Sequence, residues 1–204
     1  QCILTTPTTA CFSGLETDEK INLGNAIRYF GDGFQISKKI NNKKFWRIPV
    51  MEGEFIIEDK TSITSGIGGG NILIIGTSNK EVLKAGEAAV KEMKKIDNII
   101  LPFPGGIVRS GSKVGSKYKN LIASTNDAYC PTLKGITKTN LDKDIECVLE
   151  IVVDGINEKD IALAMKKGIS IICKKFNKGI KSISAGNYGG KLGPFHFHLR
   201  DIMK

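Results

Sequence analysis

The residues best suited to chemistry gather in one segment rich in glycine, serine and lysine, residues 102–131. It reads PFPGGIVRSGSKVGSKYKNLIASTNDAYCP and carries the cations Arg109, Lys113, Lys117 and Lys119. Glycine lets a backbone approach a ligand closely, serine supplies hydroxyl groups, and cations attract anionic groups. The segment therefore predicts a binding site for a polar, negatively charged molecule.

Glu150 is a second candidate, because it interrupts the otherwise apolar stretch of residues 148–153. A strand carboxyl with apolar neighbours either faces water at a sheet edge or is buried with a raised pKa. The first case gives a solvated or ion-paired side chain. The second gives a general acid or base that works near neutral pH. The residue pattern alone leaves both readings open.

Two glycine-rich stretches resemble nucleotide-binding motifs without matching them. Residues 106–113 approach a P-loop, but Ser112 and Lys113 stand in the reverse of the required order. Residues 66–71 precede an apolar strand instead of following one, and they lack the dinucleotide-binding spacing. We therefore predict no nucleotide cofactor.

His196 and His198 alternate on an expected strand and should share one face, but two ligands alone do not close a metal site. We predict no metal. A second glycine-rich segment, residues 184–193, contains Asn187 and Lys191. It is either a turn before the last strand or a second wall of a shared ligand cleft.

The amino-acid composition limits the classes of molecule that this protein is expected to bind. Of the chain's 204 residues, 41% are hydrophobic and 25% charged, and its net charge of +9 comes from 26 Lys and only 4 Arg. This lysine excess, with no aromatic platform on the expected sheet, argues against nucleic-acid binding. The five cysteines are scattered and read as reduced thiols of a cytoplasmic protein. No apolar run approaches the roughly 18 residues of a membrane span, so we predict no membrane partner.

The hydrophobic pattern predicts an α+β fold. After short strands at 45–50 and 54–57, it predicts strands at 71–76, 99–103, 147–153, 180–185 and 195–199. Ser78 should cap a helix that runs to about Lys95, and Asn157 a second helix. The order β-α-β-β-α-β is that of a ferredoxin-like split unit. The basic segment falls in the long connection between its two halves, where ordered loops are usually functional.

The chain resembles the formylmethanofuran–tetrahydromethanopterin N-formyltransferase family along its whole length. The resemblance is carried by Gln1-Cys2 and by residues 5–8, 30–33, 48–55, 102–108, 110–116, 123–131, 150–155 and 184–193. It implies subunits of two ferredoxin-like lobes in a homotetramer. Residues 1–50 would be the remnant of the N-terminal (proximal) lobe and residues 51–204 the complete C-terminal (distal) lobe. Roughly the first third of the family's chain would then be missing, and Gln1 is no initiator.

The implied reaction moves a formyl group from formylmethanofuran to N5 of tetrahydromethanopterin through a tetrahedral intermediate, in archaeal one-carbon metabolism. Both coenzymes have acidic tails, and the reaction needs no metal or nucleotide. The resemblance places Glu150 at the reacting formyl group. Coenzyme contacts fall, by position in the two polar segments, on Gly105, Gly106, Ser110, Ser112, Lys113, Thr125, Asn126, Asn187 and Lys191. A non-catalytic paralogue, or a subunit of a formyltransferase/hydrolase complex, is the alternative.

Overall fold

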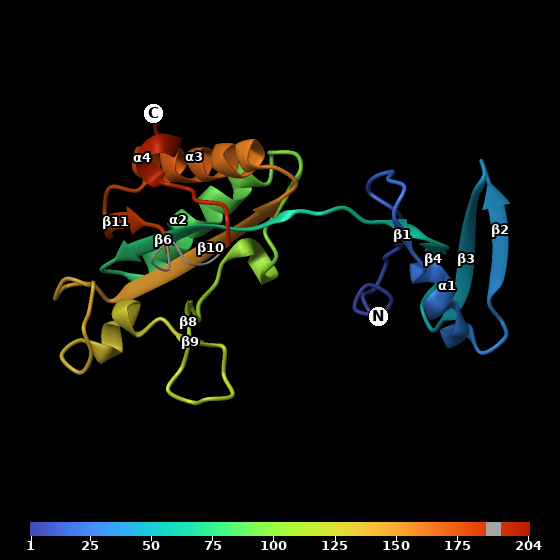
Figure 1. The fold of residues 1–204 in the computed structure, drawn as a ribbon, viewed down its shortest axis with the longest axis horizontal. Helices are drawn as coiled ribbons and strands as arrows, with labels where there is room; N and C mark the ends of the chain where they lie inside the picture. Colours follow the sequence, from blue (N-terminus) through green and yellow to red (C-terminus); the bar gives the residue numbers. More distant parts are fainter. Residues whose placement is uncertain (187–192) are drawn as a thin grey trace. The chain divides into compact units, whose positions relative to one another are not determined.

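The chain forms two compact units, Gln1–Ser65 and Gly66–Lys204. The computed structural model describes residues 1–186 and 193–204 (Figure 1). Two strands that follow residue 50 pair within the first unit. These are β4 (Gly53–Glu58), which pairs with β3 (Lys43–Val50), and β5 (Thr61–Ser62), which pairs with β1 (Lys20–Ile21).

The first unit is built on an antiparallel sheet in the order β2-β3-β4, with β2 at Ile36–Ile40. Helix α1 (Leu23–Ile27) and the 3₁₀ turn η1 (Arg28–Gly31) lie beside it. The predicted strands at 45–50 and 54–57 are confirmed as β3 and β4. Strand β2 was not predicted, because all of its side chains are exposed and give no apolar alternation.

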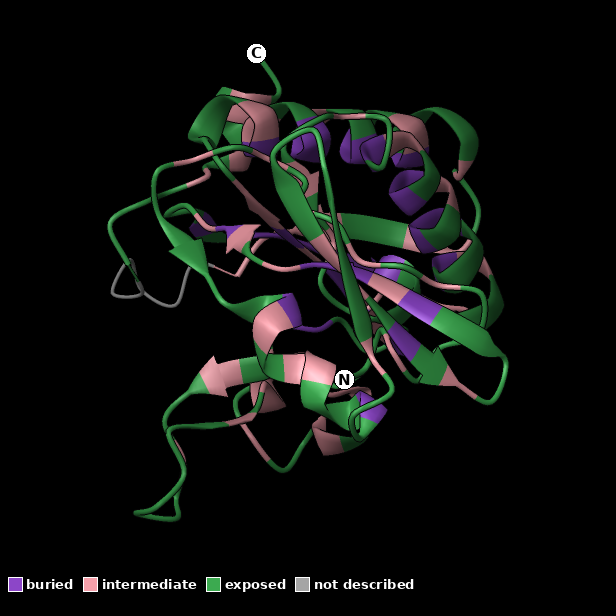
Figure 2. Ribbon diagram, turned by 90° about the vertical axis from the view of Figure 1, so that its right-hand side faces the viewer, coloured by how far each residue is buried: buried purple, intermediate pink, exposed green. Residues whose placement is uncertain are grey.

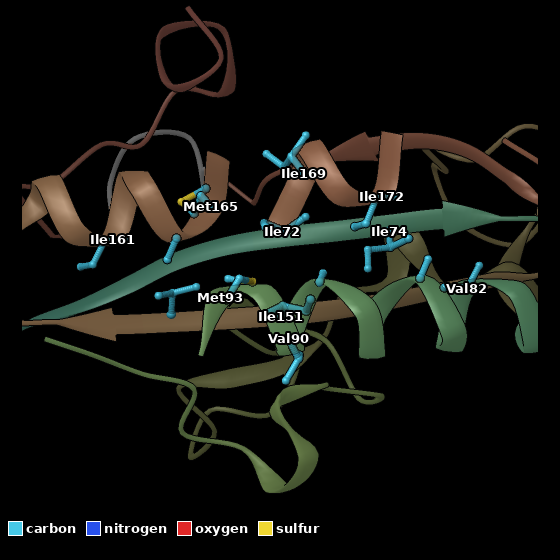
Figure 3. Packing of buried hydrophobic residues seen from close by; sticks show 14 of the residues in the cluster. Ile72, Ile74, Val82, Val90, Met93, Ile151, Ile161, Met165, Ile169 and Ile172 are labelled. Atoms are coloured by element: carbon cyan, nitrogen blue, oxygen red, sulfur yellow. The ribbon is translucent and has the colours of Figure 1, made fainter. Parts of the chain in front are cut away.

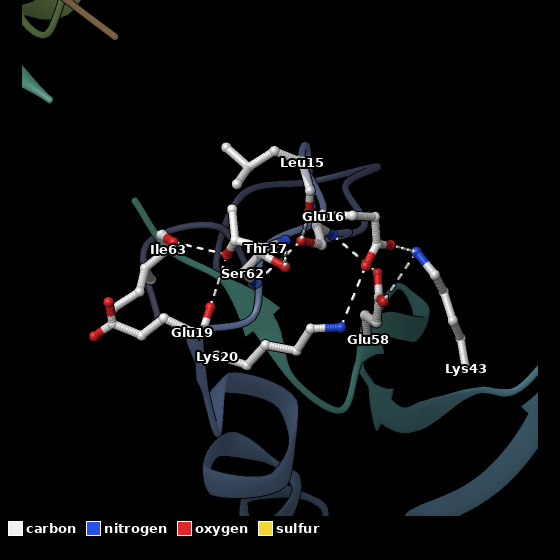
Figure 4. Close-up of polar contacts among 10 residues, drawn as sticks. Leu15, Glu16, Thr17, Glu19, Lys20, Lys43, Glu58, Ser62 and Ile63 are labelled. Atoms are coloured by element: carbon white, nitrogen blue, oxygen red, sulfur yellow. Dashed lines mark hydrogen bonds and ion pairs between the residues drawn. The ribbon is translucent and has the colours of Figure 1, made fainter. Parts of the chain in front are cut away.

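A polar cluster ties the first residues of this unit to its sheet (Figure 4). The buried Glu58 carboxylate accepts a hydrogen bond from the Ser13 backbone N–H at 2.9 Å and lies 3.5 Å from Lys43 Nζ. Glu16 pairs with both Lys43 and Lys20. Part of the chain's positive charge is thus neutralised inside the first unit.

The main sheet of the second unit has the strand order β11-β6-β10-β7, and its neighbouring strands are antiparallel. This order, together with two helices that connect the strands as β-α-β-β-α-β, is the ferredoxin-like arrangement. The α+β fold class predicted from the sequence is confirmed. The elements are β6 (Ile67–Gly76), α2 (Asn79–Met93), β7 (Ile99–Ile100), β10 (Cys147–Gly155), α3 (Glu158–Lys175) and β11 (Ile180–Ser184).

Helices α2 and α3 begin where their caps predicted. Ser78 Oγ accepts from the Glu81 N–H, and Asn157 Oδ1 accepts from the Asp160 N–H at 2.9 Å. Both helices pack on the same face of the sheet, and their buried stripes meet the strands there (Figures 2 and 3). The resulting core is made of residues such as Ile72, Ile74, Val82, Met93, Ile151, Ile161, Met165 and Ile172.

The predicted strand at 195–199 is wrong. Residues 193–198 form no strand, and the short helix α4 (Leu199–Ile202) follows them. The burial of these side chains does alternate in part, since Phe197 and Leu199 pack against the core while Phe195 is exposed. Burial at every second residue therefore came from packing beside the sheet and not from strand pairing. The strand predicted at 99–103 is shortened to β7.

The connection between β7 and β10 covers part of the sheet face opposite the helices. It contains a second small core in which Leu141 and Ile145 pack on Leu73 and Ile75, with Tyr129 and Val148 at its edge. The connection thus packs on the sheet as part of the fold. Its regular elements are η2 (Pro104–Gly106), β8 (Ser112–Val114), β9 (Ala123–Thr125), η3 (Asp127–Tyr129) and η4 (Pro131–Leu133).

Candidate active site

Glu150 lies in the middle of β10 and is buried, with 6% of its surface exposed. Its neighbour Ile151 faces the helices and the main core, so Glu150 points to the opposite face of the sheet. Burial raises the pKa of the Glu150 carboxyl, and a hydrogen bond from Asn71 opposes this increase. The second of the two readings of Glu150, a buried carboxyl held toward its neutral form, is the one that the structure supports.

Asn71 on β6 is the hydrogen-bond partner of this carboxyl. Its Nδ2 donates to Glu150 Oε1 at 2.8 Å, and its Oδ1 accepts from the Gly186 N–H at 2.8 Å. Asn71 was not among the predicted site residues, although it is a polar side chain at the start of the apolar run 72–75. Only the register, which sets Asn71 opposite Val152 and Leu73 opposite Glu150, brings the two side chains together.

The glycine-rich segment is joined to β10 at the same residue. Val108 forms an antiparallel bridge with Glu150, in which each backbone N–H donates to the other's carbonyl. Gly105 and Gly106 precede it with φ of +70° and +79°, a conformation that favours glycine. The predicted anion-binding segment and the predicted acid thus lie in contact.

Glu150 borders two clefts of the second unit. The loop cleft, about 320 Å³, is lined by the basic segment and includes Arg109, Ser110, Gly111 and Asn126. The glycine cleft, about 220 Å³, is lined by Asn71 and by residues such as Gly68, Gly69, Gly186, His196 and His198. A buried carboxyl between two openings can exchange a proton with groups bound in either of them.

The predicted binding residues fall into three groups. Ser110 and Asn126 line the loop cleft beside Glu150. Asn187 and Lys191 lie outside the residues that the structure describes. The remaining predicted residues belong to η2 or to the β8–β9 ribbon, and none of them lines either cleft: Gly105, Gly106, Ser112, Lys113 and Thr125.

Within the β8–β9 ribbon, the side chains make contacts of their own. Lys113 forms an ion pair with Asp127, and this hydrogen bond lowers the pKa of the Asp127 carboxyl. Thr125 Oγ1 lies 3.4 Å from Cys130 Sγ.

Arg109 is exposed at the loop cleft, and no ion pair to it is found among residues 1–186 and 193–204. Arg109 therefore has more free charge to offer a ligand than Lys113.

The two histidines lie with their rings stacked, the centroids 6.2 Å apart, on the wall of the glycine cleft. In the described part of the chain, no three His, Cys, Asp or Glu side chains are grouped so that they could hold a metal ion. Nor does the described part contain a helix long and apolar enough to cross a bilayer.

Two family models match the chain. Residues 53–202 match the model described as "FTR, proximal lobe", and residues 1–50 match "Formylmethanofuran-tetrahydromethanopterin formyltransferase". The chain belongs to this formyltransferase family. The resemblance seen in the sequence is thereby confirmed. The matching family model describes residues 53–202 as the proximal lobe, whereas the name expected from the sequence for this C-terminal segment was the distal lobe.

Relatives of high identity carry the formyltransferase name. The chain is 61% identical to "Formylmethanofuran--tetrahydromethanopterin formyltransferase" of Methylobacillus flagellatus, over 100% of this chain and 69% of that protein. It is 45% identical to the protein of the same name from Methanocaldococcus jannaschii, over 100% of this chain and 69% of that protein. The family therefore includes bacterial members, and membership does not restrict this chain to archaea.

Solved structures of the family share the fold. The formyltransferase/hydrolase complex from Methylorubrum extorquens with methylofuran contains a chain with a TM-score of 0.83 and 48% identity. The match covers 100% of our chain and 68% of that chain. The formyltransferase from Methanosarcina barkeri gives a TM-score of 0.83 at 44% identity, over 99% of our chain and 68% of that chain.

Proposed function

We propose that this protein transfers a formyl group from formylmethanofuran to N5 of tetrahydromethanopterin, with Glu150 as the general acid. The observation that carries the proposal is the buried Glu150 carboxyl, with its raised pKa, between two clefts. A neutral carboxyl is a hydrogen-bond donor, which a carboxylate is not. Family membership supplies the two coenzymes as substrates.

The chemistry is acyl transfer between two amines. N5 attacks the formyl carbon, and the carbonyl oxygen gains negative charge in a tetrahedral intermediate. The neutral Glu150 carboxyl donates a hydrogen bond to that oxygen and then a proton to the departing amine. The N5 proton returns to Glu150, so the residue is regenerated neutral and no external acid is consumed.

The loop cleft would hold a coenzyme's acidic part. Arg109 supplies the charge, while Ser110 and Asn126 supply hydrogen-bonding groups beside Glu150. We also propose coenzyme contacts for the other predicted residues, because they lie in the two polar segments: Gly105, Gly106, Ser112, Lys113, Thr125, Asn187 and Lys191. A cytoplasmic location and the homotetramer implied by the resemblance are further parts of the proposal.

A second candidate function rests on one relative. The chain is 49% identical to a protein of Methylorubrum extorquens that is named as a subunit of a formyltransferase/hydrolase complex. In this second candidate function, the protein is the transferase subunit of such an assembly, and a partner hydrolyses the formyl compound. Purification with its native partners would distinguish this from a self-contained enzyme.

Glu150→Gln tests the role of the acid. Glutamine keeps the shape and can still donate a hydrogen bond, but it cannot transfer a proton. We expect formyl transfer by the variant to fall about 100-fold or more, with an unchanged melting temperature at acidic pH. Transfer at the wild-type rate would rule out Glu150 as the acid.

A further inference from the structure

Resting on the proposed function, we infer that Asn71 is a positioning residue that decides which oxygen of Glu150 carries the reactive proton. Asn71 is buried, with 8% of its surface exposed, and lies on the strand next to Glu150. Both side chains project from the sheet face opposite the helices, and they border the same glycine cleft. Both polar ends of its amide are hydrogen-bonded.

The orientation of the Asn71 amide is fixed by chemistry. The Gly186 backbone N–H can only donate, so the group 2.8 Å away must be the amide oxygen of Asn71. The NH₂ group then faces Glu150 and donates to Oε1 at 2.8 Å. A flipped amide would set two donors against each other at Gly186. The contact with the Gly186 backbone therefore determines that Glu150 faces the NH₂ group of Asn71 and not its oxygen.

The proton of neutral Glu150 is placed by this donor. Oε1 accepts from Asn71, so it acts as the carbonyl oxygen of the acid, and the hydroxyl is at Oε2. Among the described residues, no hydrogen bond to Oε2 is found, and Glu150 lines both clefts. The transferable proton is thus directed away from the protein, toward the clefts that Glu150 borders.

Asn71 also limits how far burial raises the pKa of Glu150. Burial is the larger effect and raises the pKa, whereas the Asn71 hydrogen bond favours the carboxylate and lowers it. An acid must release its proton to the amine and recover it in each turnover. The donor from Asn71 stabilises the carboxylate that exists between these two steps.

The other charged and titratable groups near this pair lie on the walls of the two clefts. Arg109 and Glu146 border the loop cleft with Glu150, and the two histidines border the glycine cleft. None of them is among the causes that shift the Glu150 pKa. Asp154, also on β10, accepts at 3.0 Å from the backbone N–H of Gly69, a residue that lines the glycine cleft.

The sharpest test is Asn71→Asp, which retains the acceptor for Gly186 but replaces the donor that faces Glu150. Two carboxyls that share one proton lose it at a higher pH than one alone. We expect the alkaline limb of the kcat profile to move up by about one pH unit or more. We expect kcat at neutral pH to fall about 10- to 100-fold while KM changes little, because the proton is redirected toward the introduced carboxyl.

Asn140→Asp is the matched control. Asn140 is exposed and lines neither cleft, so the same chemical change adds the same charge without touching Glu150. Its pH profile should match that of the wild type. If Asn71→Asp is folded and has the wild-type profile and kcat, the inference is wrong, although Glu150 could still be the acid.

A second variant and a spectroscopic measurement cover the remaining outcomes. If Asn71→Asp does not fold, Asn71→Ala removes the donor without adding a carboxyl, and it should also move the alkaline limb upward. Infrared difference spectra between wild type and Glu150→Gln identify the band of the neutral Glu150 carboxyl. Titration of that band needs no coenzyme and no activity. It should shift to higher pH in Asn71→Ala, and an unchanged titration would refute the inference even if formyl transfer were absent.

Discussion

Val108 and Glu150 exchange two backbone hydrogen bonds, 2.7 Å from the Val108 N–H and 3.0 Å from the Glu150 N–H. This bridge holds the end of the glycine-rich turn against the middle of β10. The residues that follow Val108 are therefore kept at the rim of the loop cleft, next to the Glu150 side chain. Binding groups and the proposed acid are positioned by one backbone contact.

Gly106→Ala should disturb this bridge more than Gly105→Ala. Both glycines have positive φ, which costs an alanine about 1–2 kcal/mol. A Cβ at Gly106 would also lie 2.9 Å from a Val90 methyl group, whereas nothing lies within 4 Å of one at Gly105. We expect the free energy of unfolding to fall by about 1–2 kcal/mol for Gly105→Ala and by about 2–4 kcal/mol for Gly106→Ala.

Urea unfolding of the two glycine variants measures this difference. The formyl-transfer rate of Gly106→Ala should fall as well, since a shift at Gly106 would also displace Val108, two residues further along the chain. Equal losses of stability in the two variants would show that the contact with Val90 relaxes freely.

Arg109→Gln should weaken coenzyme binding more than Lys113→Gln. Arg109 is exposed at the loop cleft, whereas the Lys113 ammonium is already engaged by Asp127. We expect KM for the coenzyme whose acidic tail binds in the loop cleft to rise about tenfold for Arg109→Gln, because one charge-assisted contact is lost. Lys113→Gln should raise KM less.

Lys167→Gln is the control for net charge, because Lys167 is exposed on α3 and borders neither cleft. Initial rates at varied coenzyme concentration and at two salt concentrations give KM and its electrostatic part. A larger effect from Lys113 than from Arg109 would mean that the Asp127 ion pair opens when coenzyme binds.

Glu150→Gln should gain stability relative to the wild type as the pH rises. The folded protein holds the Glu150 proton more tightly than the unfolded chain does, because burial raises its pKa. From the unfolded value of about 4.3 upward, the wild type therefore loses stability until the pH passes the folded pKa. Below that window the carboxyl is neutral in both states, and the variant gains nothing.

Melting temperatures of wild type and Glu150→Gln between about pH 4 and pH 8 test this window. Glu87→Gln serves as the control, since Glu87 is exposed on α2. A stability difference between Glu150→Gln and wild type that is constant with pH would show that burial does not perturb the carboxyl.

The helices and central strands could be predicted because their signals are local. Ser78 and Asn157 cap the helices that they predicted, and the apolar runs became β6 and β10. The strand predicted at 195–199 failed for a physical reason. Alternating burial arises beside any packed surface, whereas a strand also needs a hydrogen-bonding partner.

The sequence by itself determined the fold class, the family resemblance and the identity of Glu150 as an anomalous carboxyl. Each of these depends on residue type and on spacing along the chain. The tertiary structure decided what surrounds Glu150: the antiparallel register that presents Asn71, the bridge that presents Val108, and the ion pair that occupies Lys113. These contacts join residues far apart in sequence, and the pKa of a carboxyl depends on such neighbours and not on its place in the chain.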